Sequence, residues 1–483
     1  MALVKEQEPL YNVMPVGQPI IFTVFDSAVI SGSNHKIKYI AEVYVDTDNS
    51  NVMVTANRVA ILKATPNLSG YGMFDFSTIL DSYVTPDYTG GEVADYATGN
   101  FSQYKGNNYS DINPHSIHQI DKFSTNRNAV RYFKVKFKIE YATTATGTVS
   151  EAGYTVESDK IVIFNGVLYD NDIFVQSANG FGYPLNQYGY YANNNGTKGV
   201  LSNAPQTQYI RENDFATLAF FNQISFAESG ESPVAATGNV DTIGDVHITF
   251  YNSSNVALST INLENIATNG GSGVTFHSHA AAKIGYVGIG TANIENAGGT
   301  IPANWHYYTV ELRTDTNIVI TSEWRFYKQT DDCKGFETIR LTWLNKWGFW
   351  DYYNFTKKSI RNFNTERKAY KQVSGTWGGS KYLISDHTGG MKNYSSTIKE
   401  TITLNTDYIT EAEALWLEEL FISNDVYILS QNSSDTTYGY IRKYITPCRL
   451  TTTDLIRKTT ANDKLIQYTF DIETDRTKKA QKI

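Results

Sequence analysis

Apolar and polar residues alternate strictly in several stretches of the chain, and this alternation predicts β-strands. Residues 130–141 show it best: every second residue from Phe133 to Tyr141 is apolar, and the residues between them are Lys or Glu. The same period of two recurs in residues 36–45, 246–250, 306–312 and 466–472. Strands of this kind bury one face and expose the other, which is typical of antiparallel sheets packed as sandwiches.

Two segments instead have the pattern of short helices. Thr410-Glu-Ala-Glu413 is a capping box, in which two side chains bond the free backbone N–H groups at a helix start, so it predicts a helix over residues 410–421. Trp416 and Leu420 lie at helical spacing and are expected to pack this helix across a sheet. Ser77 is expected to cap a shorter helix that ends near Tyr83.

These elements predict a mainly β fold: several antiparallel β-sandwich domains, with one or two short helices packed on sheets. The 483 residues suggest more than one domain. We expect an N-terminal β-sandwich over residues 1–145, a middle β-rich domain with long Gly/Asn loops over residues 146–330, and a C-terminal β domain over residues 331–483 that carries the capped helix. The Asn165-Gly166 pair, between two apolar runs, predicts a tight hairpin.

Composition supports the β assignment and narrows the function. Aromatic residues make up 13% of the chain, charged residues 19%, and Gly (35) and Asn (41) are frequent. The net charge of −8 argues against a protein whose whole surface grips nucleic-acid phosphates, so no direct sequence-specific nucleic-acid binding is expected. No apolar run is long enough to span a bilayer, so no membrane insertion is expected. Two cysteines cannot build a disulfide framework.

Candidate chemistry is sparse. The sequence has no phosphate-binding glycine loop and no Gly-x-Ser-x-Gly nucleophile turn. His277-Ser-His279 and His115-x-x-His118 could each pair imidazoles, but neither pair has a clear third ligand for a metal. The acidic hairpin around Asp46 and Asp48 lacks the glycine and terminal Glu of a calcium loop. We therefore expect no catalytic residues, no metal site and no cofactor.

The most distinctive run is residues 336–355, which contains the arrangement Trp-Leu-Asn-x-x-Gly-x-x-Asp-x-Tyr-x-Phe. Together with residues 72–84, 201–211 and 214–221, the capped helix and the final strand over 462–472, this run resembles structural virion proteins of tailed bacteriophages, of the tail or baseplate (distal-tail-like) type. The resemblance implies β-sandwich domains assembled into a symmetric ring around the tail axis, with sixfold symmetry as the expectation, and it brings no active site with it.

The expected function is therefore that of a non-enzymatic structural component of a phage virion, in a ring at the tail, baseplate or neck, made in the host bacterial cytoplasm. The expected partners are copies of itself and other virion proteins, with a host-surface glycan as a further candidate. A receptor- or carbohydrate-binding virion protein and a capsid accessory protein are the alternatives.

Aromatic residues near turns are the candidates for the subunit interface. Trp343 shares the parity of Ile339 and Leu341 and is expected in the core. Trp347 and Trp350 flank the Gly348 turn and are expected to face a neighbouring subunit. The long Gly/Asn-rich stretch over residues 181–199 is expected to be ordered by a neighbour through its tyrosines, Tyr183, Tyr188, Tyr190 and Tyr191.

Overall fold

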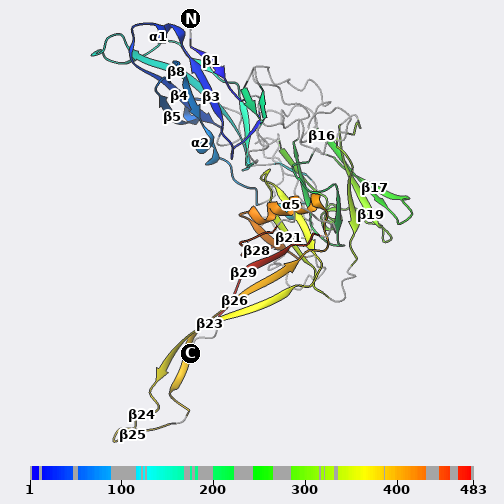
Figure 1. The fold of residues 1–483 in the computed structure, drawn as a ribbon. Helices are drawn as coiled ribbons and strands as arrows, with labels where there is room; N and C mark the ends of the chain where they lie inside the picture. Colours follow the sequence, from blue (N-terminus) through cyan, green and yellow to red (C-terminus); the bar gives the residue numbers. More distant parts are fainter. Residues whose placement is uncertain are drawn as a thin grey trace. The chain divides into compact units, whose positions relative to one another are not determined.

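The computed structural model confirms the mainly β fold, with several separate antiparallel and mixed sheets and few, short helices (Figure 1). It describes residues 3–9, 13–46, 53–88, 116–120, 123–125, 128–167, 174–176, 180–182, 200–221, 243–264, 284–314, 317–319, 321–330, 336–385, 387–430, 445–456 and 466–479. The chain divides into two compact units, each of which is described by itself. Unit 1 is Met1–Gln329 with Leu344–Asp351 and Gln431–Ser433, and unit 2 is the remainder from Thr330.

Unit 1 begins with a two-layer sandwich. One layer is a three-stranded sheet of β1 (Val4–Gln7), β3 (Ile21–Phe25) and β6 (Gly72–Asp75). The other is a seven-stranded sheet in the order β2 (Val13–Pro15), β11 (Ile161–Phe164), β8 (Val130–Ala142), β4 (His35–Val45) and β5 (Arg58–Ala64), with β9 (Ser150–Glu151) and β10 (Val156–Glu157) paired to β8. Phe22 on β3 packs on Phe133 and Phe137 of β8, with ring centroids 6.4 and 5.6 Å apart, so the predicted apolar face of β8 forms the core between the layers.

The boundary expected near residue 145 falls within this seven-stranded sheet, because β9, β10 and β11 all pair with β8. The hairpin predicted at Asn165-Gly166 is also wrong. β11 already has β8 on one side and β2, in parallel, on the other, so no edge is left for a returning strand. After the turn, the Val167 N–H donates instead to the Lys346 carbonyl oxygen at 2.8 Å.

The rest of unit 1, where the structure describes it, contains two larger groups of strands and one pair. A three-stranded sheet joins β15 (Thr217–Phe221), β18 (Ile284–Gly288) and β7 (Phe123–Thr125). A five-stranded sheet has the order β14 (Thr207–Ile210), β20 (Trp324–Lys328), β19 (Tyr307–Thr314), β16 (Ile243–Tyr251) and β17 (Ala257–Glu264). β12 (Phe174–Gln176) pairs with β13 (Gly180–Gly182).

The described part of unit 2 is built on a seven-stranded sheet with one helix. The sheet order is β22 (Trp350–Phe355), β21 (Ile339–Leu344), β27 (Val426–Leu429), β28 (Ile445–Leu450), β29 (Thr469–Lys479), β26 (Gly390–Asn405) and β23 (Ile360–Gln372), and β24 (Thr376–Trp377) pairs with β25 (Tyr382–Leu383). Helix α5 (Glu411–Ile422) begins at the predicted capping box of Thr410 and Glu413. Trp416 on α5 packs against Trp343 at 5.1 Å, which confirms that the helix lies on the sheet and that Trp343 belongs to the core.

Three further α-helices lie in the described part of unit 1: α1 (Ser27–Ser31), α2 (Ser77–Asp81) and α4 (Thr291–Asn296). Short 3-10 turns are η1 (Thr55–Asn57) and η2 (Ile117–Gln119). Helix α2 is the one predicted, but Ser77 is its first residue and not its cap. Phe76 is the N-cap residue and makes no capping hydrogen bond with its side chain, while the Asp75 carboxylate accepts the Ser77 N–H at 3.0 Å. Helix α1, which the sequence pattern did not reveal, is capped by the buried Asp26 carboxylate.

Candidate assembly surface

Trp347 and Trp350 do not face outward, and the expectation that they are presented to a neighbouring subunit is wrong. Both side chains are buried within unit 1, at 1% and 3% exposure. Trp347 stacks on Phe164 of β11, with centroids 6.4 Å apart. The Trp350 indole N–H donates to the Asp87 carbonyl oxygen at 3.0 Å, and its ring contacts His118 edge-on. The four candidate tyrosines, Tyr183, Tyr188, Tyr190 and Tyr191, lie outside the described residues.

Asn345 explains why this turn points inward. Its side-chain carbonyl accepts the backbone N–H groups of Trp347 and Phe349, at 3.0 and 3.1 Å, and so closes the turn. Its amide donates to the Leu201 carbonyl and to the Asp351 carboxylate, which ties the turn to another part of unit 1. Gly348 has a φ of +80°, and a Cβ there would lie 1.5 Å from the Asn165 carbonyl oxygen. Contacts with distant residues therefore hold the turn at residues 345–348 inside the chain, an arrangement that we call the clamp.

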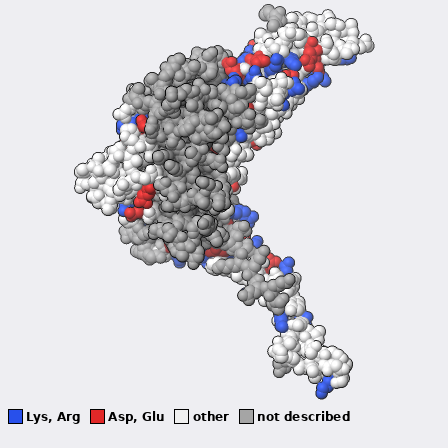
Figure 2. Space-filling view, turned by 180° about the vertical axis from the view of Figure 1, so that it is seen from behind, with Lys and Arg blue, Asp and Glu red and all other residues white. Residues whose placement is uncertain are grey.

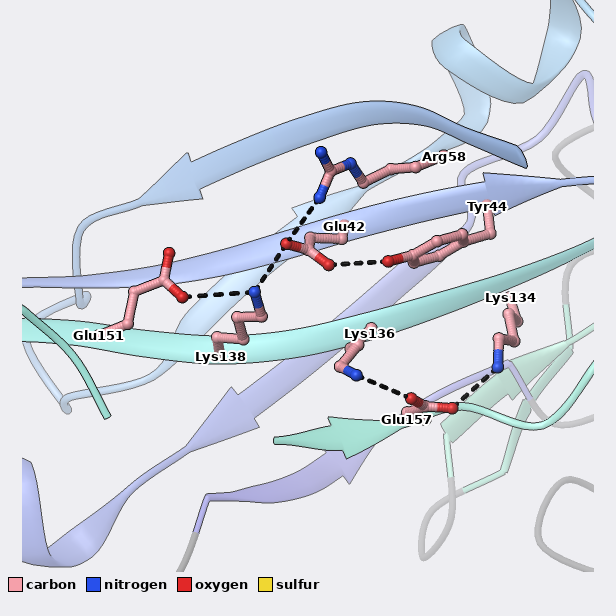
Figure 3. Close-up of polar contacts among 8 residues, drawn as sticks. All are labelled: Glu42, Tyr44, Arg58, Lys134, Lys136, Lys138, Glu151 and Glu157. Carbon is pink, nitrogen blue, oxygen red and sulfur yellow. Dashed lines mark hydrogen bonds and ion pairs between the residues drawn. The ribbon is translucent and has the colours of Figure 1, made fainter. Parts of the chain in front are cut away.

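The charged face of the first large sheet is neutralised by its own neighbours (Figure 3). The three lysines of β8 form a basic row, yet Lys134 and Lys136 contact Glu157 at 2.8 and 3.2 Å, and Lys138 contacts the buried Glu42 at 2.8 Å. Burial alone would raise the pKa of Glu42, but hydrogen bonds from Lys138 and Tyr44 outweigh it and hold that pKa below the usual value. Because these cations are already paired, this face is a poor site for phosphate groups.

Unit 2, in contrast, contains a long and exposed two-stranded ribbon. Antiparallel strands β23 and β26 pair from Ile360↔Thr403 to Gln372↔Gly390, and Figure 1 shows them running out from the sheet of unit 2 towards β24 and β25. All thirteen residues of β23 are exposed. Strand β29 pairs with β26 only as far as Thr397↔Lys479, so among the described strands the part beyond is two-stranded. We call residues 360–405 the ribbon.

The base of the ribbon is fixed to the sheet by Arg361. Its guanidinium donates to both carboxylate oxygens of Glu337, at 2.7 and 3.1 Å, and to the buried Glu400 at 2.6 Å. The hydrogen bond with Glu337 is the largest effect that raises the pKa of Arg361, so the anchor stays charged throughout the physiological range. Farther along β26, Ile402 and Leu404 are buried in the core of unit 2. The base of the ribbon is therefore well packed in unit 2.

The tip of the ribbon exposes large apolar side chains. Trp377 is 67% exposed and Ile384 is 77% exposed, while Val373 and Met391 are similarly open. The tip is nevertheless ordered by hydrogen bonds: Trp377 pairs with Tyr382, the Gly378 N–H donates to the Lys381 carbonyl, and the Tyr382 hydroxyl donates to the Ser374 carbonyl at 2.5 Å. Exposed apolar groups held in a defined shape are typical of an interaction site.

Sequence reasoning missed the ribbon, although the sequence carries a signal for it. Residues 360–372 have polar side chains at both parities, so neither face of the strand suits a core. Glycines cluster between the two strands, at Gly375, Gly378 and Gly379 and again at Gly389 and Gly390. A β-strand without a buried face, followed by a glycine-rich segment with Trp and Leu, indicates a projecting hairpin.

Chemically reactive clusters are sparse in the described part of the chain. No group of three or more His, Cys, Asp or Glu residues there could hold a metal ion. His118 packs in the interior, and His115, His277, His279 and Cys333 lie outside the described residues. Burial raises the pKa of the Cys448 thiol to about 12, which keeps it protonated and unreactive. Among the described residues, no helix has the length and apolar character needed to cross a membrane.

Comparisons with known proteins give weak likenesses. No family model and no curated protein match the chain. Trypsin-activated alpha-2-macroglobulin from Escherichia coli aligns with 97% of this chain and 23% of its own, at 11% identity and a TM-score of 0.18. Salmonella alpha-2-macroglobulin reacted with methylamine covers the same shares at 9% identity and a TM-score of 0.17. The chain thus spans 23% of the length of these two macroglobulins, and likenesses with such TM-scores carry no argument about fold or function.

Proposed function

We propose that this protein is a non-enzymatic structural component of a tailed-bacteriophage virion, and that it joins a ring at the tail, baseplate or neck by placing its ribbon on a neighbouring subunit. The observation that carries the proposal is the ribbon itself, an ordered two-stranded extension with exposed apolar side chains at its tip. The resemblance of residues 336–355 and of the other phage-like segments supplies the virion context.

The ribbon needs a partner for physical reasons. Two-stranded hairpins are marginally stable in water unless a further strand or a packed layer covers them. Beyond Thr397 the described ribbon has neither, although Tyr370 and Tyr394 contact each other across its strands at 6.2 Å. A neighbour that covers the tip removes Trp377 and Ile384 from water, and burial of each large apolar side chain contributes about 1.5–3 kcal/mol.

Charge complementarity favours a second copy of this chain as that partner. Residues 360–405 contain seven Lys or Arg residues and three Asp or Glu residues, a net charge of +4. Because the whole chain carries −8, the remaining residues carry −12. Figure 2 shows Lys and Arg side chains along the ribbon. A basic arm on an otherwise acidic chain is attracted to the body of another copy, and the attraction also steers their encounter.

The double variant Trp377→Ala/Ile384→Ala in the full chain tests this function. We expect the wild-type protein to form a closed oligomer in mass photometry, whereas the variant stays monomeric and unfolds at the wild-type temperature. Leu68→Ala, which truncates a fully exposed leucine in unit 1, is the matched control and is expected to assemble normally. If the double variant is incorporated into virions at the wild-type level, the ribbon is not the assembly element.

A further inference from the structure

A row of four tyrosines crosses the five-stranded sheet of unit 1. Tyr209, Tyr327, Tyr307 and Tyr251 lie on the neighbouring strands β14, β20, β19 and β16, and each is the direct cross-strand partner of the next. Their ring centroids are 6.1, 5.2 and 4.8 Å apart in that order. We call these residues the tyrosine row.

The tyrosine row lies on the face of the sheet that is not used for the core. The residues of opposite parity, such as Phe250, Tyr308 and Phe326, are at most 3% exposed and form the apolar side. Tyr251 and Tyr327 are half-buried, and Tyr209, at the end of the row on edge strand β14, is 58% exposed. Tyr307, in the middle, is covered by its neighbours. The row is therefore partly exposed at Tyr251 and Tyr327 and most accessible at its β14 end, where Tyr209 lies.

A second row, of polar side chains, runs parallel to the tyrosines. The pairing of the strands places Thr207, Arg325, Thr309, Thr249 and Thr260 next to one another across all five strands. Arg325 is held in place: its guanidinium donates to Glu323 at 2.5 and 3.1 Å and lies 5.0 Å from the centroid of the Tyr307 ring. Hydrogen bonds with Glu323 and then Tyr327 raise its pKa, so it remains a fixed cation.

The side chains on this face indicate the chemical class of its ligand. Its polar groups are hydroxyls, an imidazole at His247, an amide at Asn262, a carboxylate at Asp245, and two Arg–Glu pairs in which the charges cancel. On this face of the described strands β16, β19 and β20, every residue from Asp245 to Tyr251, from Tyr307 to Arg313 and from Arg325 to Tyr327 is aromatic, polar or charged. The centre of a permanent protein interface is apolar instead. Arg313 and Arg325 are each paired with a Glu, and Asp245 adds a negative charge that disfavours an anionic ligand. Rigid aromatic rings beside planar hydrogen-bonding groups suit the C–H and hydroxyl groups of an uncharged sugar.

We propose that the tyrosine row and Arg325 form a binding site for a neutral oligosaccharide. Three strand spacings of about 4.8 Å make the row roughly 14 Å long, enough for about three hexose units. The sugar ring at the β14 end stacks on Tyr209, and the hydroxyl groups farther along bond the accessible members of the two rows: Arg325, Thr207, Thr249, Tyr327 and Tyr251. The site consists of residues of unit 1 and the ribbon of residues of unit 2, so the proposal adds a saccharide-binding role and does not rest on assembly through the ribbon.

Titration of the full chain with a panel of neutral linear trisaccharides, of glucose, galactose, mannose and N-acetylglucosamine, tests the site by saturation-transfer NMR and calorimetry. We expect at least one trisaccharide to bind, and Tyr209→Ala and Arg325→Gln each to weaken it by about tenfold or more. Tyr209→Phe keeps the ring and is expected to lose much less. Tyr370→Ala, which removes a tyrosine from the ribbon, is the control and is expected to bind like the wild type.

Three outcomes would overturn the proposal. The first is that no trisaccharide of the panel binds to the wild type. The second is binding that Tyr209→Ala and Arg325→Gln leave unchanged although both variants fold normally. The third is loss of self-association in Tyr209→Ala, measured by sedimentation, without an effect on sugar binding, which would assign the row to contact with a second copy.

Discussion

Replacing Gly348 by Ala tests whether the turn that carries Trp347 is clamped inside the chain. Gly348 has a φ of +80°, and a Cβ on it would lie 1.5 Å from the Asn165 carbonyl oxygen, a backbone atom that cannot move alone. Gly298, also in unit 1, has a φ of +85° with open space around its would-be Cβ. The two glycines therefore share the backbone strain of a substitution and differ in the clash.

The two variants should differ by several kcal/mol. Each Ala costs about 1–2 kcal/mol for the left-handed backbone conformation. At Gly348 the turn must also move away from β11, which breaks the hydrogen bond between Val167 and Lys346, worth about 0.5–1.5 kcal/mol, and loosens the buried Trp347. Complete truncation of a core Trp costs about 3–5 kcal/mol, so we expect Gly348→Ala to lose about 3 kcal/mol more than Gly298→Ala.

Urea unfolding of the full chain, followed by tryptophan fluorescence, measures both free energies. Gly298→Ala should unfold somewhat earlier than the wild type, and Gly348→Ala clearly earlier than both. Equal losses of stability in the two variants would refute the clamp, since they would mean that the turn can shift freely away from Asn165.

Three further predictions concern the core, the charged face and the capped helix. Trp347→Ala should destabilise the isolated chain by about 3–5 kcal/mol in the same assay; a normally stable variant that fails only in assembly would restore the interface role. The pKa values of Glu42 and Glu157 are lower in the folded state, so the stability that they contribute is present above about pH 4.5 and is lost as the pH falls through their folded-state pKa values. Glu42→Gln should therefore lose less unfolding free energy than the wild type as the pH is lowered below about 4.5. A loss equal to that of the wild type would contradict the pairing with Lys138. Thr410→Ala should lower the free energy of unfolding by about 1 kcal/mol, because the Glu413 N–H loses its acceptor, whereas Thr410→Ser should retain most of the wild-type stability. Equal losses in both variants would argue against the cap.

Local chemistry allowed part of this structure to be derived from sequence alone. The alternation in residues 36–45 and 130–141 predicted β4 and β8, and the parity of Trp343 predicted its burial, because a strand offers each side chain one of two faces. The capping box fixed the start of α5, because its hydrogen bonds join residues three apart. Such features depend on residues that are close together in the chain, so they can be predicted from the sequence alone.

The tertiary structure decided which surfaces remained free. Gly348 marks a turn, but only the placement of Asn165, and of Asp87 at 263 residues from Trp350, determines that the turn is buried. The Asn165-Gly166 pair has the local signature of a hairpin, yet neighbouring strands already occupy both edges of β11. The tyrosine row is likewise a product of strand register, since it gathers residues from four separate parts of the chain. Periodicity assigns each side chain to a face, and only long-range pairing determines what covers that face.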